Sequence, residues 1–193
     1  MKKIVFASNN LNKIVEIQNL VGDSYLIITP KDIGFTDHIE ENLPTLEGNA
    51  RLKAFTIYSR FGLDCFADDT GLEVDALSGE PGVHSARYAG MSQDSSANIS
   101  KLLSRMNGVL DRRARFRTVI ALFLEGQEYF FEGIIYGKIL HTIQGDNGFG
   151  YDPVFIPDGY DQSFAEMTLS EKNRISHRAM AINKLVEFLR KHY

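Results

Sequence analysis

The chain has 193 residues, of which 44% are hydrophobic and 24% charged, and its formal net charge is −4. This balance is ordinary for one globular domain, and the negative charge disfavours a nucleic-acid polymer as the partner, since such proteins carry a basic stripe. No apolar stretch approaches membrane-spanning length, and a single cysteine, Cys65, excludes an internal disulfide. We therefore expect a cytoplasmic protein with no membrane partner.

The first third of the chain predicts a strand and two helices. Lys3–Ala7 is typical of a buried strand, and a helix should begin after Asn10, where apolar residues recur at helical spacing. A second helix is predicted over residues 46–61, which carry an apolar stripe.

Two neighbouring aspartates follow the next apolar run, and they are the most informative residues of the chain. Gly62–Ala67 predicts a short strand that ends on Asp68 and Asp69, with Gly71 supplying permissive dihedrals for a turn. Adjacent carboxylates repel each other, so a buried pair needs a cation, and oxygen ligands suit Mg²⁺. An exposed acidic turn is the alternative explanation for an arbitrary Asp-Asp pair.

The middle of the chain predicts a short helix over residues 98–106 and then a hairpin. The arms, 115–124 and 128–136, flank a short loop that contains glycine, and residues 138–141 would extend the second arm.

The last quarter predicts an irregular segment and a terminal helix. Residues 145–159 are rich in Gly, Asp and Pro, whereas residues 173–191 are periodic, and Thr168 and Glu171 have capping-box spacing ahead of them. Together these elements predict an α/β fold around a mixed sheet of parallel and antiparallel strands, with residues 1–193 forming one functional domain.

Several cationic side chains suit an anionic ligand. Ser8–Lys13, which includes Asn9 and Asn10, joins a strand to a helix, and a helix start attracts anions. Lys53 lies at the edge of an apolar helical stripe, where a snorkelling lysine and a ligand-binding one are equally compatible with the periodicity. Lys172 and Arg178, the latter on the apolar side of the last helix, form a third cationic element.

Two further segments offer a metal ligand and a stacking surface. Glu40 or Glu41, in an acidic loop, could join Asp69 around a metal, and spacing alone does not choose between them. Gly148–Pro153 combines glycines, aromatic rings and an acid, which suits either a nucleotide base or a tight turn with core aromatics. His177 could hydrogen-bond to a ligand, although an exposed helical histidine is the commoner case. Cations for phosphates, carboxylates for a metal and an aromatic for a base indicate a nucleoside polyphosphate site.

Six motifs, in order along nearly the whole chain, resemble those of the inosine/xanthosine triphosphate pyrophosphatases, which remove non-canonical purine nucleotides. They are Ser8-Asn-Asn-x-x-Lys13, Thr45-Leu-Glu-Gly-Asn-Ala-x-x-Lys-Ala54, Ala67-Asp-Asp-Thr-Gly-Leu72, Gly79-x-Pro-Gly-x-x-Ser-Ala-Arg-Tyr-Ala-Gly90, Gly148-Phe-Gly-Tyr-Asp-Pro153 and Ser176-His-Arg178.

The resemblance implies two lobes with the active site in a cleft between them, usually a homodimer, and Mg²⁺-dependent hydrolysis of ITP, dITP and XTP to the monophosphate and pyrophosphate. It implies that Asp69 is general base and metal ligand, with Asp68 and Lys53 completing the catalytic set and Glu40 or Glu41 the metal set. The residues implied to contact the nucleotide are Ser8, Asn9, Asn10, Lys13, Lys53, Thr70, Phe149, Gly150, Tyr151, Asp152, Lys172, His177 and Arg178. The acidic loop departs from the family pattern, because many relatives carry a glycine there.

Three other functions compete with this one. A regulatory module would bind a purine triphosphate without hydrolysing it. A septum-site-type pyrophosphatase would act on modified pyrimidine or canonical nucleotides, and the Asp-Asp-Thr-Gly and Ser-His-Arg motifs disfavour it. An aspartyl-phosphate phosphatase would need Asp-x-Asp rather than neighbouring aspartates.

Overall fold

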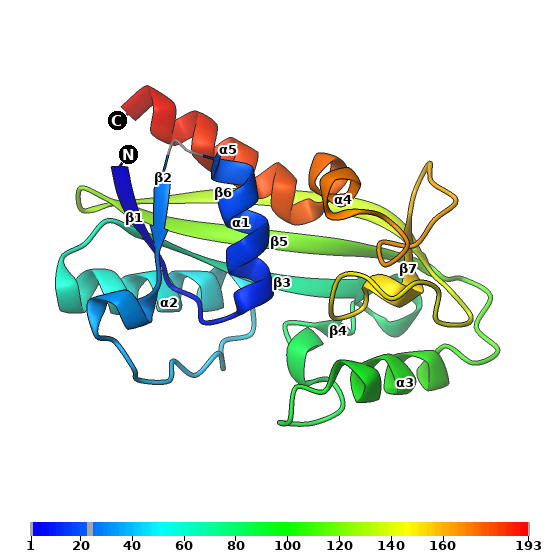
Figure 1. Ribbon diagram of the computed structural model, residues 1–193. Helices are drawn as coiled ribbons and strands as arrows, with labels where there is room; N and C mark the ends of the chain where they lie inside the picture. The colour runs from blue at the N-terminus through cyan, green and yellow to red at the C-terminus, as the bar shows by residue number, and fades with distance from the viewer. Residues whose placement is uncertain (1, 23–24, 193) are drawn as a thin grey trace. The chain divides into compact units, whose positions relative to one another are not determined.

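The structure is a computed structural model that describes residues 2–22 and 25–192 (Figure 1). It contains a seven-stranded sheet with the order β2 (Tyr25–Ile28), β1 (Lys2–Phe6), β3 (Cys65–Val74), β5 (Arg113–Leu124), β6 (Gln127–Ile139) and β7 (Phe155–Pro157), and β4 (Pro81–Gly82) pairs with β3. The pairs β1–β2 and β1–β3 are parallel, whereas β3–β4 and β6–β7 are antiparallel. The predicted mixed sheet flanked by helices is therefore confirmed. Within the described residues, no helix combines the length and the apolar character that crossing a membrane requires.

The chain forms two compact units, and the sequence ranges of each are interleaved. Unit 1 comprises Met1–Asp69, Thr118–Gly133 and Arg178–Tyr193, and unit 2 comprises Thr70–Arg117 and Ile134–His177. The predictions of a single functional domain and of a cleft between lobes stay predictions.

Unit 1 contains the amino-terminal elements, the start of β3, the parts of β5 and β6 next to their hairpin turn (Thr118–Gly133) and the last helix. They are β1 (Lys2–Phe6), α1 (Leu11–Val21), β2 (Tyr25–Ile28), η2 (Pro30–Ile33), α2 (Leu46–Phe61), β3 (Cys65–Val74), β5 (Arg113–Leu124), β6 (Gln127–Ile139) and α5 (His177–His192).

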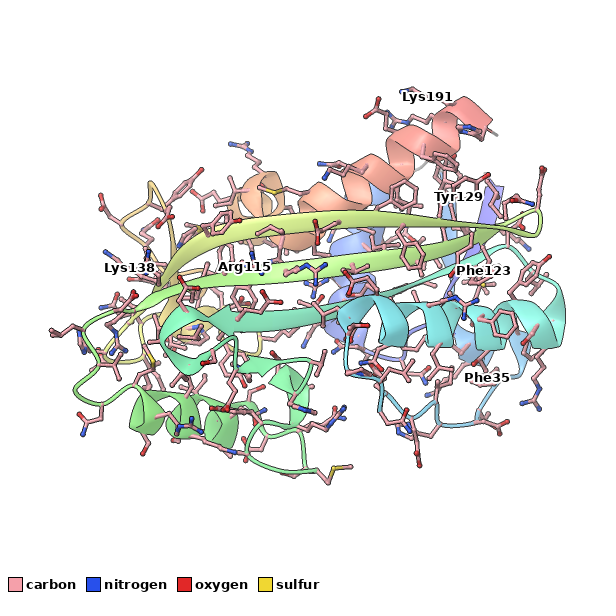
Figure 2. All side chains as sticks on the ribbon, turned by 180° about the vertical axis from the view of Figure 1, so that it is seen from behind. Phe35, Arg115, Phe123, Tyr129, Lys138 and Lys191 are labelled. Atoms are coloured by element: carbon pink, nitrogen blue, oxygen red, sulfur yellow. The ribbon has the colours of Figure 1, made fainter. Side chains whose placement is uncertain are left out.

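Alternation along the strands of unit 1 builds two apolar layers. Phe6 and its neighbours on one face pack with α1 and α5, whereas Val5 faces α2. Phe123 on β5 packs against α2 and Tyr129 on β6 against α5 (Figure 2), with ring centroids 5.3 Å from Tyr58 and 4.4 Å from Phe188. The sheet of unit 1 is thus covered by helices on both faces.

The first two helices begin where capping residues predict. Asn10 Oδ1 accepts a hydrogen bond from the Lys13 amide at 3.2 Å, and Thr45 Oγ1 accepts one from the Gly48 amide at 3.1 Å. The predicted start of the first helix and the predicted bounds of the second are confirmed.

The prediction that the strand ends on Asp68 and Asp69 was wrong. β3 continues to Val74, and Gly71 lies inside it rather than in a turn. A Cβ at Gly71 would approach the Gly82 carbonyl oxygen to 2.7 Å, closer than real contacts allow. Glycine is therefore required there by the close approach of a neighbouring strand and not by its conformational freedom.

Unit 2 contains the rest of β3, β5 and β6 and several short elements. They are η3 (Asp75–Leu77), β4 (Pro81–Gly82), η4 (Ser85–Arg87), α3 (Ser95–Arg105), η5 (Asp152–Val154), β7 (Phe155–Pro157) and α4 (Leu169–Ile175). In the core of unit 2, Leu102 of α3 and Phe116 of β5 belong to one apolar cluster. Side chains of the 145–167 region, such as Phe155 and Phe164, belong to the same cluster.

The hairpin is confirmed, since β5 and β6 are neighbours joined at Glu125 and Gly126. β6 extends beyond residue 136 as predicted, but it ends at Ile139 rather than at residue 141. Both turn residues have positive φ, 48° and 82°, which suits a tight hairpin turn. The short helix begins earlier than predicted, because Asp94 accepts hydrogen bonds from the Ser96 and Ala97 amides.

Two predictions for the last quarter of the chain need correction. Residues 145–159 are not wholly irregular, because η5 and β7 lie within them. The single terminal helix is two helices, α4 and α5, which are separated at Ser176 with an extended ψ of 152°. The capping box of Thr168 and Glu171 is confirmed, but it begins α4 rather than the long helix.

Candidate functional site

A buried cluster of charged side chains forms within unit 1, and four elements and one loop contribute to it. Its members are Lys13 and Glu16 from α1, Glu41 from the segment before α2, Lys53 from α2, Asp68 and Asp69 from β3, and Arg178 from α5. The exposed fractions of Asp68, Arg178 and Asp69 are 1%, 2% and 7%. Burial of so many ionic groups costs stability unless they neutralise one another, so a cluster of this kind is a candidate for a functional site.

One half of the cluster is centred on Asp68. Lys13 Nζ lies 2.8 Å from one oxygen of Asp68 and 2.9 Å from the other. Arg178 Nε lies 3.6 Å from Asp68, and its Nη1 donates to Glu16. Two cations and two carboxylates therefore alternate along this half.

The other half is centred on Lys53. Its Nζ lies 2.7 Å from Glu41 and 3.9 Å from Asp69. Asn49 Nδ2 donates to Asp69 at 3.2 Å, and the Asn49 side-chain amide also exchanges hydrogen bonds with the Leu43 backbone. Asn49 thereby ties the segment that carries Glu41 to the strand that carries Asp69.

The two aspartates have opposite electrostatic environments. Burial would raise the pKa of Asp68, but Lys13, Arg178 and Lys53 together hold that pKa well below its usual range. Burial, together with the nearby carboxylates of Glu41 and Asp68, raises the pKa of Asp69 to about 6 against the opposing pull of Lys53 and Lys13. Asp68 is thus a fixed anion, whereas Asp69 can exchange a proton near neutral pH, as a general base must.

The carboxylates of this cluster suit a hard divalent cation. Over residues 2–22 and 25–192, no group of three or more His, Cys, Asp or Glu side chains is arranged to hold a metal by itself. Mg²⁺ does not need one, because it is usually held by one or two carboxylates together with water and substrate phosphates. Asp69 and Glu41 both contact Lys53, so they are the carboxylates that fit, whereas Glu40 makes no such contact among the described residues.

The predicted phosphate-binding loop lies at the start of α1. Ser8 Oγ accepts a hydrogen bond from the Asn10 amide at 3.2 Å, and both Asn9 and Asn10 are exposed. Lys13, in the first turn of the helix, directs its ammonium group to Asp68. The start of the helix and this ammonium group together offer donors to an anion.

The remaining predicted residues, which are Thr70, Phe149, Gly150, Tyr151, Asp152, Lys172 and His177, belong to unit 2. Buried Lys172 Nζ lies 2.7 Å from Asp152 and 5.0 Å from the centroid of the Phe149 ring. The same Asp152 oxygen accepts a hydrogen bond from the Phe149 amide at 2.8 Å, so the two ends of the 149–152 loop are bonded to each other. Gly150 has a φ of 62°, and His177 stacks on Phe116 with centroids 4.6 Å apart.

Sequence reasoning does not find Glu16, which belongs to this buried network. It does single out Asn49, which lies one turn before Lys53 on nearly the same helix face, so that both side chains could reach one ligand. A signal for Glu16 exists, since it follows Lys13 by three residues and therefore lies on the same side of α1.

The Ham1 family model matches residues 4–188. The chain belongs to the Ham1 family. The Ham1 protein of Staphylococcus aureus has a similar structure, with a TM-score of 0.90, 41% identity and 100% of both chains covered. Two curated Ham1 relatives, from Flavobacterium johnsoniae and Porphyromonas gingivalis, are each 51% identical and named dITP/XTP pyrophosphatase. The first alignment covers 97% of both chains and the second 98% of both.

Proposed function

We propose that this chain is a nucleoside triphosphate pyrophosphohydrolase that cleaves dITP, ITP and XTP to the monophosphate and pyrophosphate with Mg²⁺. The observation that carries the proposal is the buried cluster of unit 1, in which Lys13 and Lys53 lie beside Asp68 and Asp69. Such lysines suit a polyphosphate, and such carboxylates suit a metal. The names of the curated Ham1 relatives support the same substrate class.

In the proposed mechanism, Asp69 accepts a proton from the water that attacks phosphorus, and the anhydride bond that releases pyrophosphate breaks. A bound Mg²⁺, held by Asp69 and Glu41, would offset charge on the phosphates. Lys13 and Lys53 stabilise the charge that develops on the phosphate oxygens, and Asp68 holds Lys13 in place. In the metal-free protein the pKa of Asp69 is raised to about 6, and a bound Mg²⁺, which would lower this pKa, would keep the carboxylate ionised and able to accept the proton.

Selectivity for the base is proposed to come from the residues of unit 2. A 6-keto purine presents an acceptor where adenine presents a donor. A pocket lined with donors such as Lys172 and His177 would therefore leave adenine mismatched, which is costly once the groups are desolvated.

The proposed function is tested by incubating the protein with ITP, dITP, XTP, GTP and ATP in the presence of Mg²⁺ and identifying the products. Release of pyrophosphate and monophosphate from the first three, at rates well above those for GTP and ATP, is the expected result. Tight binding of ITP without any pyrophosphate would instead identify a regulatory module. Preference for pyrimidine or canonical nucleotides would indicate the septum-site type.

Replacing Lys13 or Lys53 by alanine is expected to weaken triphosphate binding about tenfold or more, because each ammonium group offsets phosphate charge. The affinity for a non-hydrolysable dITP analogue measures this loss. Lys184→Ala is the matched control, since Lys184 of the same unit donates to the Glu132 carbonyl at 2.7 Å in an exposed position. Unchanged KM and kcat in the Lys13 and Lys53 variants would return both lysines to a structural role.

The ionisation of Asp69 provides a test of the metal that does not depend on activity. In the metal-free protein, carboxyl NMR should show Asp69 titrating with a pKa of about 6, so that it is protonated below that pH and charged above it. Mg²⁺ should lower this pKa, because a bound cation favours the carboxylate. Asp68 should stay charged throughout, as the internal control. If Mg²⁺ did not change the pKa of Asp69, Asp69 would not be a ligand of the metal.

The resemblance also implies a homodimer, and we retain this assembly and a cytoplasmic location as parts of the proposal. Sedimentation of the purified protein would test the dimer.

A further inference from the structure

A network of buried hydrogen bonds in unit 2 converges on Ser85, in a motif that the proposed function leaves without a role. Ser85 Oγ accepts a hydrogen bond from the Leu72 amide at 2.9 Å and donates one to the Gly82 carbonyl at 2.6 Å. The Ser85 carbonyl accepts a hydrogen bond from the Tyr151 hydroxyl at 2.8 Å. Ser85 thus bonds to three segments, which are β3 at Leu72, β4 at Gly82 and the loop that holds Tyr151.

Two of these segments carry residues of the proposed site. Leu72 follows Asp69 and Thr70 on β3, and Tyr151 lies in the Phe149–Asp152 loop. Asp152 of this loop bonds to Lys172 of α4 and to the Phe149 amide, so these two bonds do not reach β3. The hydroxyl of Tyr151 is therefore a direct connection from the loop to the segment that borders β3.

Close packing makes this connection rigid. β4 lies beside β3 (Figure 1) and pairs with it so that Gly82 is opposite Leu72. A Cβ at Gly71 would have no space against the Gly82 carbonyl. On the other side, the Asn98 side chain of α3 accepts the Ala89 amide at 2.6 Å and donates to the Ala86 carbonyl at 2.9 Å. The segment around Ser85 is thus held to both a strand and a helix, and it has little freedom to move.

We propose that Ser85 is a positioning residue that fixes the strand bearing Asp69 and Thr70 and the Phe149–Asp152 loop to one rigid segment. This inference rests on the proposed function, in which the strand carries the residues that act on the phosphates and the loop carries residues that contact the base. Through its hydroxyl, Ser85 acts on the strand, and through its carbonyl it acts on the loop. The two connections are chemically separate, so they can be broken one at a time.

Tyr151→Phe removes the connection to the loop and leaves the one to the strand. A loosened loop should weaken substrate binding equally in the ground state and the transition state. We expect KM for dITP to rise about fivefold, which is the worth of one buried hydrogen bond, while kcat stays within about twofold. Tyr88→Phe is the matched control, because it deletes the same group in the same unit, where the hydroxyl donates to Glu80 at 3.0 Å. It should change neither constant.

Ser85→Ala removes the connection to the strand and leaves the carbonyl that Tyr151 uses. The Leu72 amide then loses its hydroxyl acceptor, and the adjoining carboxylate is held less firmly in its reactive position. We expect kcat to fall about tenfold with KM within about twofold, the opposite split from Tyr151→Phe.

These variants are assayed beside the wild-type protein, well below their melting temperatures. Variants that are folded and melt at lower temperature, but whose KM and kcat match those of an active wild-type protein, would show a purely structural role and overturn the inference. If both variants changed KM and kcat in the same way, the inference that Ser85 positions the strand and the loop through separate bonds would be overturned. A wild-type protein that fails to hydrolyse dITP would instead contradict the proposed function itself.

Discussion

Replacing Asp69 by asparagine is expected to lower kcat for dITP by at least about a hundredfold while the nucleotide still binds, because the variant has no carboxylate to accept the proton of the attacking water. The amide has the same shape as the carboxyl group, and its oxygen can still accept the hydrogen bond of Asn49. Loss of turnover with retained affinity would separate the role of Asp69 as a base from any role in holding the substrate.

The fold should tolerate this substitution. The pKa of Asp69 is raised to about 6 by burial, which means that the folded protein already disfavours its charge. Removing that charge should therefore not lower the melting temperature. Asp64→Asn is a suitable control in the same unit, since the amide oxygen can keep the hydrogen bond that Asp64 accepts from the Glu125 amide at 2.9 Å. Full activity of Asp69→Asn would exclude Asp69 as the base.

Local sequence signals predict most of the helices and strands because those elements depend on short-range physics. Asn10 and Thr45 cap their helices through side-chain oxygens that are recognisable from the sequence. The hairpin at Gly126 follows from a glycine between two apolar runs. In each case the residues that decide the structure lie within a few positions of one another.

Predictions fail where a distant segment decides the outcome. Asp68, Asp69 and Gly71 look like the end of a strand, yet β3 continues because β4 approaches it closely at Gly82. A tertiary contact of this kind is not encoded in local propensity. The break at Ser176 escapes prediction for a different reason, because the apolar periodicity runs on through both helices.

The sequence predicts several residues of the candidate site but not how they contact one another, because the contacts join distant segments. Lys13, Lys53 and the aspartates come from separate motifs, and the structure brings them within contact distance of one another in unit 1. Of Glu40 and Glu41, the structure places Glu41 against Lys53, a contact that the sequence does not predict, and the choice of metal ligand between them stays a prediction. Glu16 escapes notice because its significance comes from Arg178, which is 162 residues away in the chain.

Replacing Glu16 by alanine is expected to destabilise the protein by about 3–5 kcal/mol, the usual result of removing one partner of a buried ion pair. Arg178 is only 2% exposed and donates to Glu16, so the substitution removes a carboxylate from beside a buried cation. Asp68, which lies 3.6 Å from Arg178, is also paired with Lys13. Urea unfolding measures the loss. Asp37→Ala is the control, because the Arg60–Asp37 pair of the same unit has side chains 55% and 62% exposed and should contribute about 0–1 kcal/mol.

A double variant distinguishes the contribution of this pair to stability from its contribution to function. Glu16→Leu with Arg178→Met replaces both charges by apolar groups, which often restores the stability lost when one charge is removed. If the pair served only folding, the double variant would also recover activity. We expect a folded protein that hydrolyses dITP poorly, because Arg178 also approaches Asp68 and is a proposed ligand of the nucleotide. Stability that returns without activity would show that the two charges are kept for binding and catalysis, and a fully active double variant would contradict that role.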